Sequence, residues 1–80
     1  SADPNALVLV LNSTSADCIG TALRVQAEAI AAGYRVRLEQ RPKKLGNLLE
    51  VMQQHGFGSW AAVGEELVRF ADLEVKRLGA

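Results

Sequence analysis

The hydrophobic pattern of the chain opens with an uninterrupted apolar run, Ala6 to Leu11, which ends at the polar segment 12–15. Six apolar residues without polar alternation are typical of a strand that is covered on both faces. In a short chain this predicts the central strand of a sheet flanked by helices. We therefore expect Ala6 to Leu11 to be central and buried, with the other elements packed around it.

A helical pattern follows over residues 17–32. Thr14 and Asp17 resemble a capping box at its start, with Asp in place of Glu or Gln. Gly33 stands where helices commonly end in a left-handed backbone conformation. A spacing of 3.6 residues predicts that one apolar stripe of this helix is buried. The stripe consists of Ile19, Ala22, Leu23, Ala27 and Ile30.

Alternation of apolar and charged residues from Tyr34 to Gln40 predicts an edge strand with one dry face. Because a strand, a helix and a strand with short connections form a βαβ unit, this strand should lie parallel to the first. Pro42 suits the first turn of a second helix, which closes at His55 and Gly56. Its buried stripe is expected to be Leu45, Leu48, Leu49 and Met52.

Two short strands are expected after the second helix. Trp60 to Val63 predicts a third parallel strand beside the first, and alternation over 73–77 predicts a final edge strand antiparallel to its neighbour. The segment 67–71 fits a helical turn or a loop. The predicted fold is a small α/β domain of order βαβαββ, a mixed sheet with a parallel core in two or three layers. It should span residues 6–80 after a tail or linker at residues 1–5.

Composition limits the class of protein. Eighty residues, of which 49% are hydrophobic and 22% charged, fit a single domain. A lone cysteine, Cys18, rules out a disulfide framework and favours a reducing, cytoplasmic compartment. The longest apolar run is far below the roughly 20 residues that span a bilayer, so no membrane partner is expected. Nine basic and nine acidic residues balance, and any attraction for nucleic acid must therefore be local.

Catalytic and cofactor chemistry find little support in the sequence. His55 is the only histidine and lies on a different helix from Cys18, so a cysteine nucleophile would have no base beside it. No residues have the spacing of metal ligands. The first strand is followed by Asn-Ser-Thr-Ser rather than by a glycine-rich phosphate loop. We expect no catalytic residue, no metal and no cofactor in this domain.

Basic residues cluster from the second strand into the following helix, with Glu39 the only acid among them. Such a patch either contacts phosphates or belongs to a solvated edge strand whose charges oppose edge-to-edge pairing. Likewise, Tyr34, Phe57 and Trp60 either stack on bases or belong to the core. The clustered basic residues are Arg35, Arg37, Arg41, Lys43 and Lys44.

The order of elements and several segments resemble the anticodon-binding domain shared by the class II aminoacyl-tRNA synthetases for histidine, threonine, proline and glycine. The histidine enzymes resemble the chain most, because their domains also pass from a strand ending in Gly-Glu through a short link to a Val-Lys strand. Besides the opening strand, the resemblance rests on residues 31–36 (AAGYRV), 41–46 (RPKKLG), 61–67 (AAVGEEL) and 73–78 (LEVKRL).

The resemblance implies a mixed sheet with helices that binds the anticodon stem and loop of a tRNA, while a separate domain of the synthetase carries out aminoacylation. It implies base-edge hydrogen bonds from Asn47 and from Glu65 or Glu66. It also implies phosphate contacts along the basic cluster. The expected RNA-binding residues are Arg35, Arg37, Arg41, Lys43, Lys44, Asn47, Glu65 and Glu66.

Two features depart from that family. Residues 46–54 contain no basic residue and include Glu50, which predicts a weaker affinity for RNA. The chain also stops at Gly79-Ala80, where the family continues into a terminal strand or helix, which predicts a truncated chain or a diverged relative. The alternative function is a degenerate synthetase-like domain that serves as a protein-interaction, dimerisation or regulatory module.

Overall fold

The computed structural model describes residues 2–79, so Ser1 of the expected tail and Ala80 at the end of the expected domain lie outside it. The predicted order βαβαββ is confirmed, with one 3₁₀ turn, η1, before the last strand. The elements are β1 (Asp3–Leu11), α1 (Ala16–Ala31), β2 (Arg35–Gln40), α2 (Leu45–Gln54), β3 (Phe57–Val63), η1 (Phe70–Asp72) and β4 (Lys76–Arg77).

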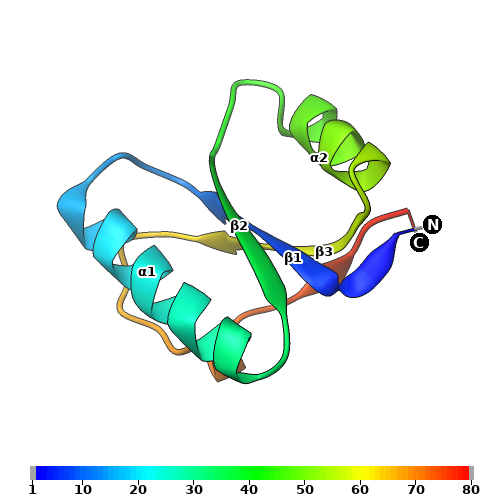
Figure 1. The fold of residues 1–80 in the computed structure, drawn as a ribbon. Helices are drawn as coiled ribbons and strands as arrows, with labels where there is room; N and C mark the ends of the chain where they lie inside the picture. The colour runs from blue at the N-terminus through cyan, green and yellow to red at the C-terminus, as the bar shows by residue number, and fades with distance from the viewer. Residues whose placement is uncertain (1, 80) are drawn as a thin grey trace.

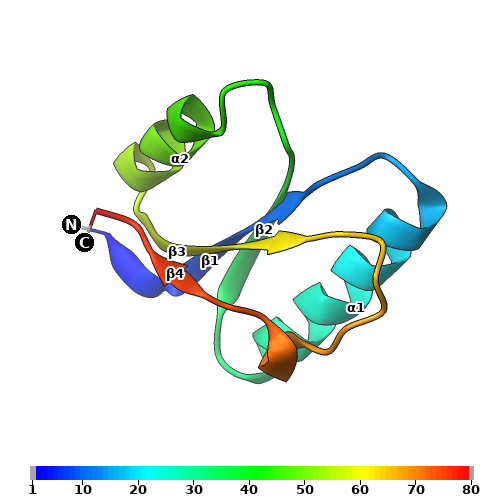
Figure 2. The same ribbon diagram turned by 180° about the vertical axis from the view of Figure 1, so that it is seen from behind.

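The four strands form one mixed sheet in the order β2-β1-β3-β4. β2 and β3 both run parallel to β1, and β4 runs antiparallel to β3. The first crossover, through α1, places β2 on one side of β1. The second, through α2, passes in the opposite direction and places β3 on the other side of β1. Right-handed crossovers in opposite directions place their helices on opposite faces of the sheet. α1 and α2 accordingly lie on opposite sides of the sheet (Figures 1 and 2), so the domain has three layers.

β1 is the central buried strand, as the apolar run predicts. Residues 6–10 have no exposed surface and Leu11 is 7% exposed. Successive side chains point to opposite faces of a strand, so Leu7 and Leu9 join the cluster under α1, whereas Val8 and Val10 join the cluster under α2. A strand that supplies both apolar clusters has no place for a polar residue, which explains the uninterrupted run.

β1 begins at Asp3, three residues before the expected Ala6, because β3 pairs with this segment too. The Asp3 amide donates a hydrogen bond to the Gly56 carbonyl at 2.9 Å, and the buried Ser59 hydroxyl donates one to the Pro4 carbonyl at 2.6 Å. The pairing is irregular between Asp3 and Leu7. These contacts also start β3 at Phe57, before the predicted Trp60.

Gly58 allows this close approach of the two backbones. A Cβ atom at Gly58 would lie 2.6 Å from the carbonyl carbon and oxygen of Asp3 and 2.8 Å from the Pro4 nitrogen. Since real Cβ atoms do not approach backbone atoms so closely, only glycine fits without moving β1. Gly58 is therefore a buried interior residue of the sheet.

The start of α1 differs from the predicted capping box of Thr14 and Asp17. The N-cap is Ser15, whose hydroxyl accepts a hydrogen bond from the Cys18 amide at 3.1 Å. Ser15 is extended at its backbone, as N-cap residues are. The prediction was wrong by one residue because three of the four polar residues in segment 12–15 are hydroxyl side chains suited to capping.

The buried stripe of α1 was also predicted wrongly, apart from Ala22. Ile19, Leu23 and Ile30 are 42%, 52% and 54% exposed, and Ala27 is exposed as well. The helix carries apolar residues around most of its circumference, so two different stripes have helical spacing. Small side chains allow the helix to approach β1 closely, and the residues that face the sheet are Cys18, Thr21, Ala22, Val25 and Ala29.

α2 confirms its predicted stripe but begins later than expected. Met52 is buried, and three leucines of the stripe pack against the cluster of Val8 and Val10. The helix starts at Leu45 with Lys44 as its N-cap residue, so Pro42 lies in the preceding connection and not in the first turn. The backbone of Lys44 has φ −115° and ψ 86°, which is not helical, so the helix cannot begin before Leu45.

The chain after β3 crosses the α1 face of the sheet and ends in an edge strand that is shorter than predicted. The strand β4 consists of Lys76 and Arg77, which lie opposite Trp60 and Ser59 and run antiparallel to β3 as expected. The Leu78 amide then donates a hydrogen bond to the Gly58 carbonyl of β3 at 2.9 Å. The undecided segment 67–71 becomes a loop that leads into η1. Four apolar side chains of this stretch pack against the α1 cluster: Val68, Phe70, Leu73 and Val75.

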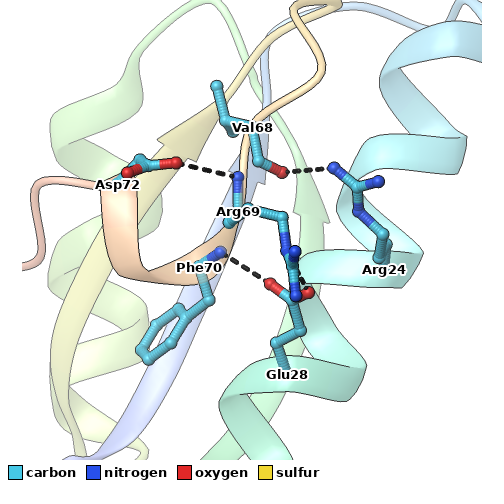
Figure 3. A network of polar contacts seen from close by, with 6 residues as sticks. All are labelled: Arg24, Glu28, Val68, Arg69, Phe70 and Asp72. Atoms are coloured by element: carbon cyan, nitrogen blue, oxygen red, sulfur yellow. Dashed lines mark hydrogen bonds and ion pairs between the residues drawn. The ribbon is translucent and has the colours of Figure 1, made fainter.

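Polar contacts fix this segment to α1 (Figure 3). Arg24 donates a hydrogen bond to the Val68 carbonyl at 2.8 Å. Glu28 accepts hydrogen bonds from the Phe70 amide at 2.8 Å and from Arg69 Nε at 2.6 Å. The Phe70 amide, with Arg69 and Arg24, holds the pKa of Glu28 below its ordinary value. An ionised Glu28 therefore links α1 to the stretch that precedes β4.

The three aromatic residues considered for base stacking all pack against the apolar clusters, which supports the core interpretation. Tyr34 packs beneath α1 with its ring edge-on to Phe70 at a centroid distance of 5.3 Å. Phe57 and Trp60 pack with the α2 cluster, and the Lys76 ammonium lies 5.1 Å from the Trp60 ring centroid.

Candidate nucleic-acid interface

The carboxyl ends of the three parallel strands meet at one edge of the sheet. The Asn12 amide after β1 donates to the Val63 carbonyl at 2.9 Å, and the Arg41 amide after β2 donates to the Leu11 carbonyl at 2.9 Å. In open α/β sheets this edge is where ligands usually bind, beside the strand at which the order reverses. Here that strand is β1, since β2 and β3 lie on its two sides.

Polar side chains connect along this edge. Arg41 Nη1 donates a hydrogen bond to Asn12 Oδ1 at 2.9 Å. On the other side, Ser13 Oγ donates one to Glu65 Oε2 at 3.3 Å. The polar edge of Arg41, Asn12, Ser13 and Glu65 thus runs across all three strand ends; we call it the carboxyl rim.

A groove opens beside the rim, between the end of β2 and the first turns of α2. Its volume is about 510 Å³. It exists because α2 packs over β1 and β3, and the same face of the edge strand β2 stays uncovered. We call it the β2–α2 groove; it is lined by Glu39, Gln40, Pro42, Lys43, Lys44, Asn47, Leu48 and Val51.

The groove favours an anionic ligand. Lys43 and Lys44 are exposed and form no ion pair within residues 2–79. The acid in the groove, Glu39, is paired with Arg37, whose Nε lies 2.6 Å from Glu39 Oε2. No side chain caps the start of α2 and its first turn holds no acid. The partial positive charge of this helix end therefore adds to the two ammonium groups.

The structure brings only part of the predicted RNA-binding set together. Lys43, Lys44 and Asn47 line the groove, and Arg41 stands on the rim next to it. Arg37 reaches the groove through its pair with Glu39. Glu65 lies at the far end of the rim.

Two residues of that set lie apart from the groove. Arg35 is at the amino end of β2, where it pairs with Asp3 at 3.6 Å, and it lies four residues, or about 13 Å along the strand, before Glu39 at the edge of the groove. Glu66 is exposed in the turn after β3. Sequence reasoning missed Asn12 and Gln40 as parts of this edge, and the signal that identifies them is their position at the carboxyl ends of parallel strands.

Other sites receive no support from the described residues. Residues 2–79 hold no group of three or more His, Cys, Asp or Glu side chains that is arranged to bind a metal. None of the helices among these residues is long and apolar enough to cross a membrane. Cys18 is buried and its thiol donates to the Val63 carbonyl at 3.4 Å, which makes it a packing residue.

Together, fold and rim define a small mixed α/β domain with a polar carboxyl edge, an architecture consistent with an anticodon-binding domain. Over 78 residues the chain is 37% identical to a histidine–tRNA ligase of Leifsonia xyli subsp. xyli, strain CTCB07. The match covers 98% of the chain but 17% of that ligase. No protein-family model and no solved structure matches the chain significantly. The predicted resemblance is confirmed: the chain is an α/β domain related to a segment of histidine–tRNA ligase.

Proposed function

We propose that this domain binds the anticodon stem and loop of a tRNA, as the anticodon-binding part of a histidine–tRNA ligase or a close relative. The observation that carries the proposal is the β2–α2 groove, where two lysines that form no ion pair within residues 2–79 lie at the N-terminus of α2, which no side chain of these residues caps. The similarity to a histidine–tRNA ligase supports it. Aminoacylation would belong to another part of such a protein.

The residues around the groove divide into two roles. Arg41, Lys43 and Lys44 contact phosphates, which position an RNA without reading its sequence. Asn47 presents an amide to the edge of an unstacked base, and Leu48 and Val51 supply the apolar wall against which that base rests. Glu65 contacts a second base at the far end of the rim. The roles of Arg35 and Glu66 stay predictions.

The number of phosphate contacts determines how strongly binding depends on salt concentration. About three phosphate contacts give a slope of log K against log salt of about −2, since each contact contributes about −0.7 on a single strand. Raising salt from about 50 to about 200 mM then weakens binding about 20-fold. The overall charge of the chain is zero, so no long-range attraction compensates at high salt.

The test measures binding of a fluorescently labelled anticodon stem-loop of histidine tRNA by anisotropy at several salt concentrations. Lys43→Ala with Lys44→Ala should weaken binding and reduce the slope by about 1.4. The matched control is Lys76→Ala with Arg77→Ala, which removes two adjacent exposed charges on β4, at the other edge of the sheet. The control should bind like the unchanged protein.

Equal weakening by both double variants would refute the groove as the RNA site. Binding with no salt dependence would refute the phosphate contacts. Absence of binding at low salt would favour the alternative function, a synthetase-like domain that acts as a protein-interaction or regulatory module.

A further inference from the structure

A short loop carries Glu65 to the carboxyl rim. It consists of residues 64–67, which directly follow β3, and we call it the rim loop. Glu65, Glu66 and Leu67 are exposed, so the loop has little packing of its own. Among residues 2–79, no backbone–backbone hydrogen bond involves the rim loop. The position of Glu65 therefore depends on how the two ends of the loop are held.

The first end of the rim loop is fixed by the sheet and by α1. Val63, the last residue of β3, is buried, and its carbonyl accepts a hydrogen bond from the Asn12 amide at 2.9 Å. The Cys18 thiol of α1 donates to the same carbonyl at 3.4 Å. Two elements that are far apart in the sequence thus hold the residue from which the loop departs.

The second end is fixed by Arg24 of α1 (Figure 3). Arg24 Nη2 donates a hydrogen bond to the Val68 carbonyl at 2.8 Å, and the Val68 side chain packs against the α1 cluster. Glu28 holds Arg69 and the Phe70 amide, which lie further along the chain. Within the described residues, Arg24 is therefore the polar side chain that holds the chain nearest to this end of the rim loop.

Stability alone does not account for an arginine at this position. The Nε atom of Arg24 is buried and finds no hydrogen-bond acceptor among residues 2–79. A buried donor without an acceptor costs about as much free energy as one hydrogen bond contributes. An apolar side chain of similar length would therefore serve the packing of α1 equally well. Only a donor can hold the Val68 carbonyl, however, which indicates that the contact positions the chain.

We propose that Arg24 is a positioning residue, which holds Val68, fixes the rim loop and keeps Glu65 beside Ser13 on the carboxyl rim. That Glu65 contacts a base there rests on the proposed function. Ser13 Oγ donates to Glu65 Oε2 at 3.3 Å, a long bond between exposed groups that does not fix the loop by itself. A loop that already has the shape required for binding loses less entropy when the ligand binds. Arg24 thus strengthens RNA binding without touching the RNA.

A nitroxide spin label on the rim loop tests the positioning without RNA. Leu67→Cys places the label on a side chain that is 75% exposed, while the buried Cys18 stays unlabelled. Arg24→Met removes the donors and keeps an unbranched side chain, so it should make the label at position 67 more mobile and sharpen its EPR spectrum. Glu50→Cys, at an exposed position of α2, carries the control label, whose spectrum should not change.

Two results of the spin-label experiment would overturn the proposal. Equal spectra at position 67 with and without Arg24→Met would show that Arg24 does not hold the rim loop. An equal gain in mobility at positions 50 and 67 would show that Arg24→Met loosens the whole domain.

A double-mutant cycle with the labelled anticodon stem-loop tests the consequence for binding. Glu65→Ala should weaken binding about tenfold, which is the effect of one hydrogen bond to a charged group. Arg24→Met should weaken binding several-fold in the unchanged chain, but by no more than about twofold in a chain that already carries Glu65→Ala. In a chain that carries Lys43→Ala it should keep its full effect, because Lys43 lies in the β2–α2 groove and not on the rim loop.

Arg24→Lys is the conservative variant, because lysine can still donate to the Val68 carbonyl and should restore most of the binding. A full effect of Arg24→Met in the Glu65→Ala chain overturns the proposal, and so does binding that Glu65→Ala weakens but Arg24→Met does not. Binding that Glu65→Ala leaves unchanged overturns the contribution of Arg24 to RNA binding. If the unchanged chain binds no stem-loop, the proposed function fails, and the spin label alone decides whether Arg24 fixes the rim loop.

Discussion

Substitution of Gly58 in β3 tests how closely the backbones of β1 and β3 approach each other. Gly58→Ala places a methyl group 2.6 Å from the Asp3 carbonyl and 2.8 Å from the Pro4 nitrogen. These are backbone atoms held in the sheet by the Asp3 amide and by the Ser59 hydroxyl, so they cannot swing aside as a flexible side chain would. The backbone of Gly58 does not have a positive φ, and the effect is therefore purely steric.

Overpacking of a rigid site costs about 1–3 kcal/mol. Replacing glycine also reduces the conformational entropy of the unfolded chain, which stabilises the folded state by about 0.4–1 kcal/mol. Gly58→Ala should thus lower the free energy of unfolding by about 1–2 kcal/mol, which corresponds to a fall in Tm of roughly 5–15 °C for a domain of this size.

Gly20→Ala is the matched control, because it is the same chemical change at an open position of α1. An added Cβ would meet nothing within 4 Å. Alanine is favoured over glycine in a helix by about 0.8–1.0 kcal/mol, so this variant should be more stable than the unchanged chain.

Urea denaturation followed by far-UV circular dichroism compares the three proteins. The two alanine variants should shift the midpoint in opposite directions with unchanged m-values. A Gly58→Ala protein as stable as the unchanged chain would refute the close approach of β1 and β3.

Two further predictions concern the ends of α1. Ser15→Ala should lower the free energy of unfolding by about 1 kcal/mol, whereas Thr14→Ala should change it by less than about 0.5 kcal/mol, because only the Ser15 hydroxyl accepts from the Cys18 amide; the reverse order in urea denaturation would contradict this cap. The pKa of Glu28 is lowered in the folded chain, mainly by the hydrogen bond from the Phe70 amide and also by Arg69 and Arg24. The contribution of Glu28 to stability is therefore complete above the unfolded pKa of 4.5, and it is lost as the pH falls through the lower pKa of the folded chain. Unfolding midpoints measured across this acidic range should fall less steeply for Glu28→Gln, and identical slopes would contradict the role of the ionised carboxylate.

The sequence determined the order of elements and the central place of β1, because both depend on local signals. An apolar run buried on two faces excludes polar residues, and a strand, helix and strand with short links has one favoured handedness. The α2 stripe was predictable for the same reason, since its polar face and apolar face are distinct in the sequence.

Tertiary structure decided which face of α1 is buried. Apolar residues surround most of this helix, so periodicity alone fits two stripes equally. Packing against β1 selected the stripe with small side chains, Ala22 and Ala29 among them, since these let the helix sit closest to the sheet. The larger residues Leu23 and Ile30 were left exposed on the outside of the helix.

In the candidate RNA site, too, part of the arrangement follows from the sequence and part only from the tertiary structure. The basic cluster was visible in the sequence, and its second half, Lys43 and Lys44, does lie together with Asn47. Only the parallel register places Arg41 against Asn12 and separates Arg35 from both. Charge is a local property of the sequence, whereas the distance between two charges depends on how strands far apart in the chain are aligned.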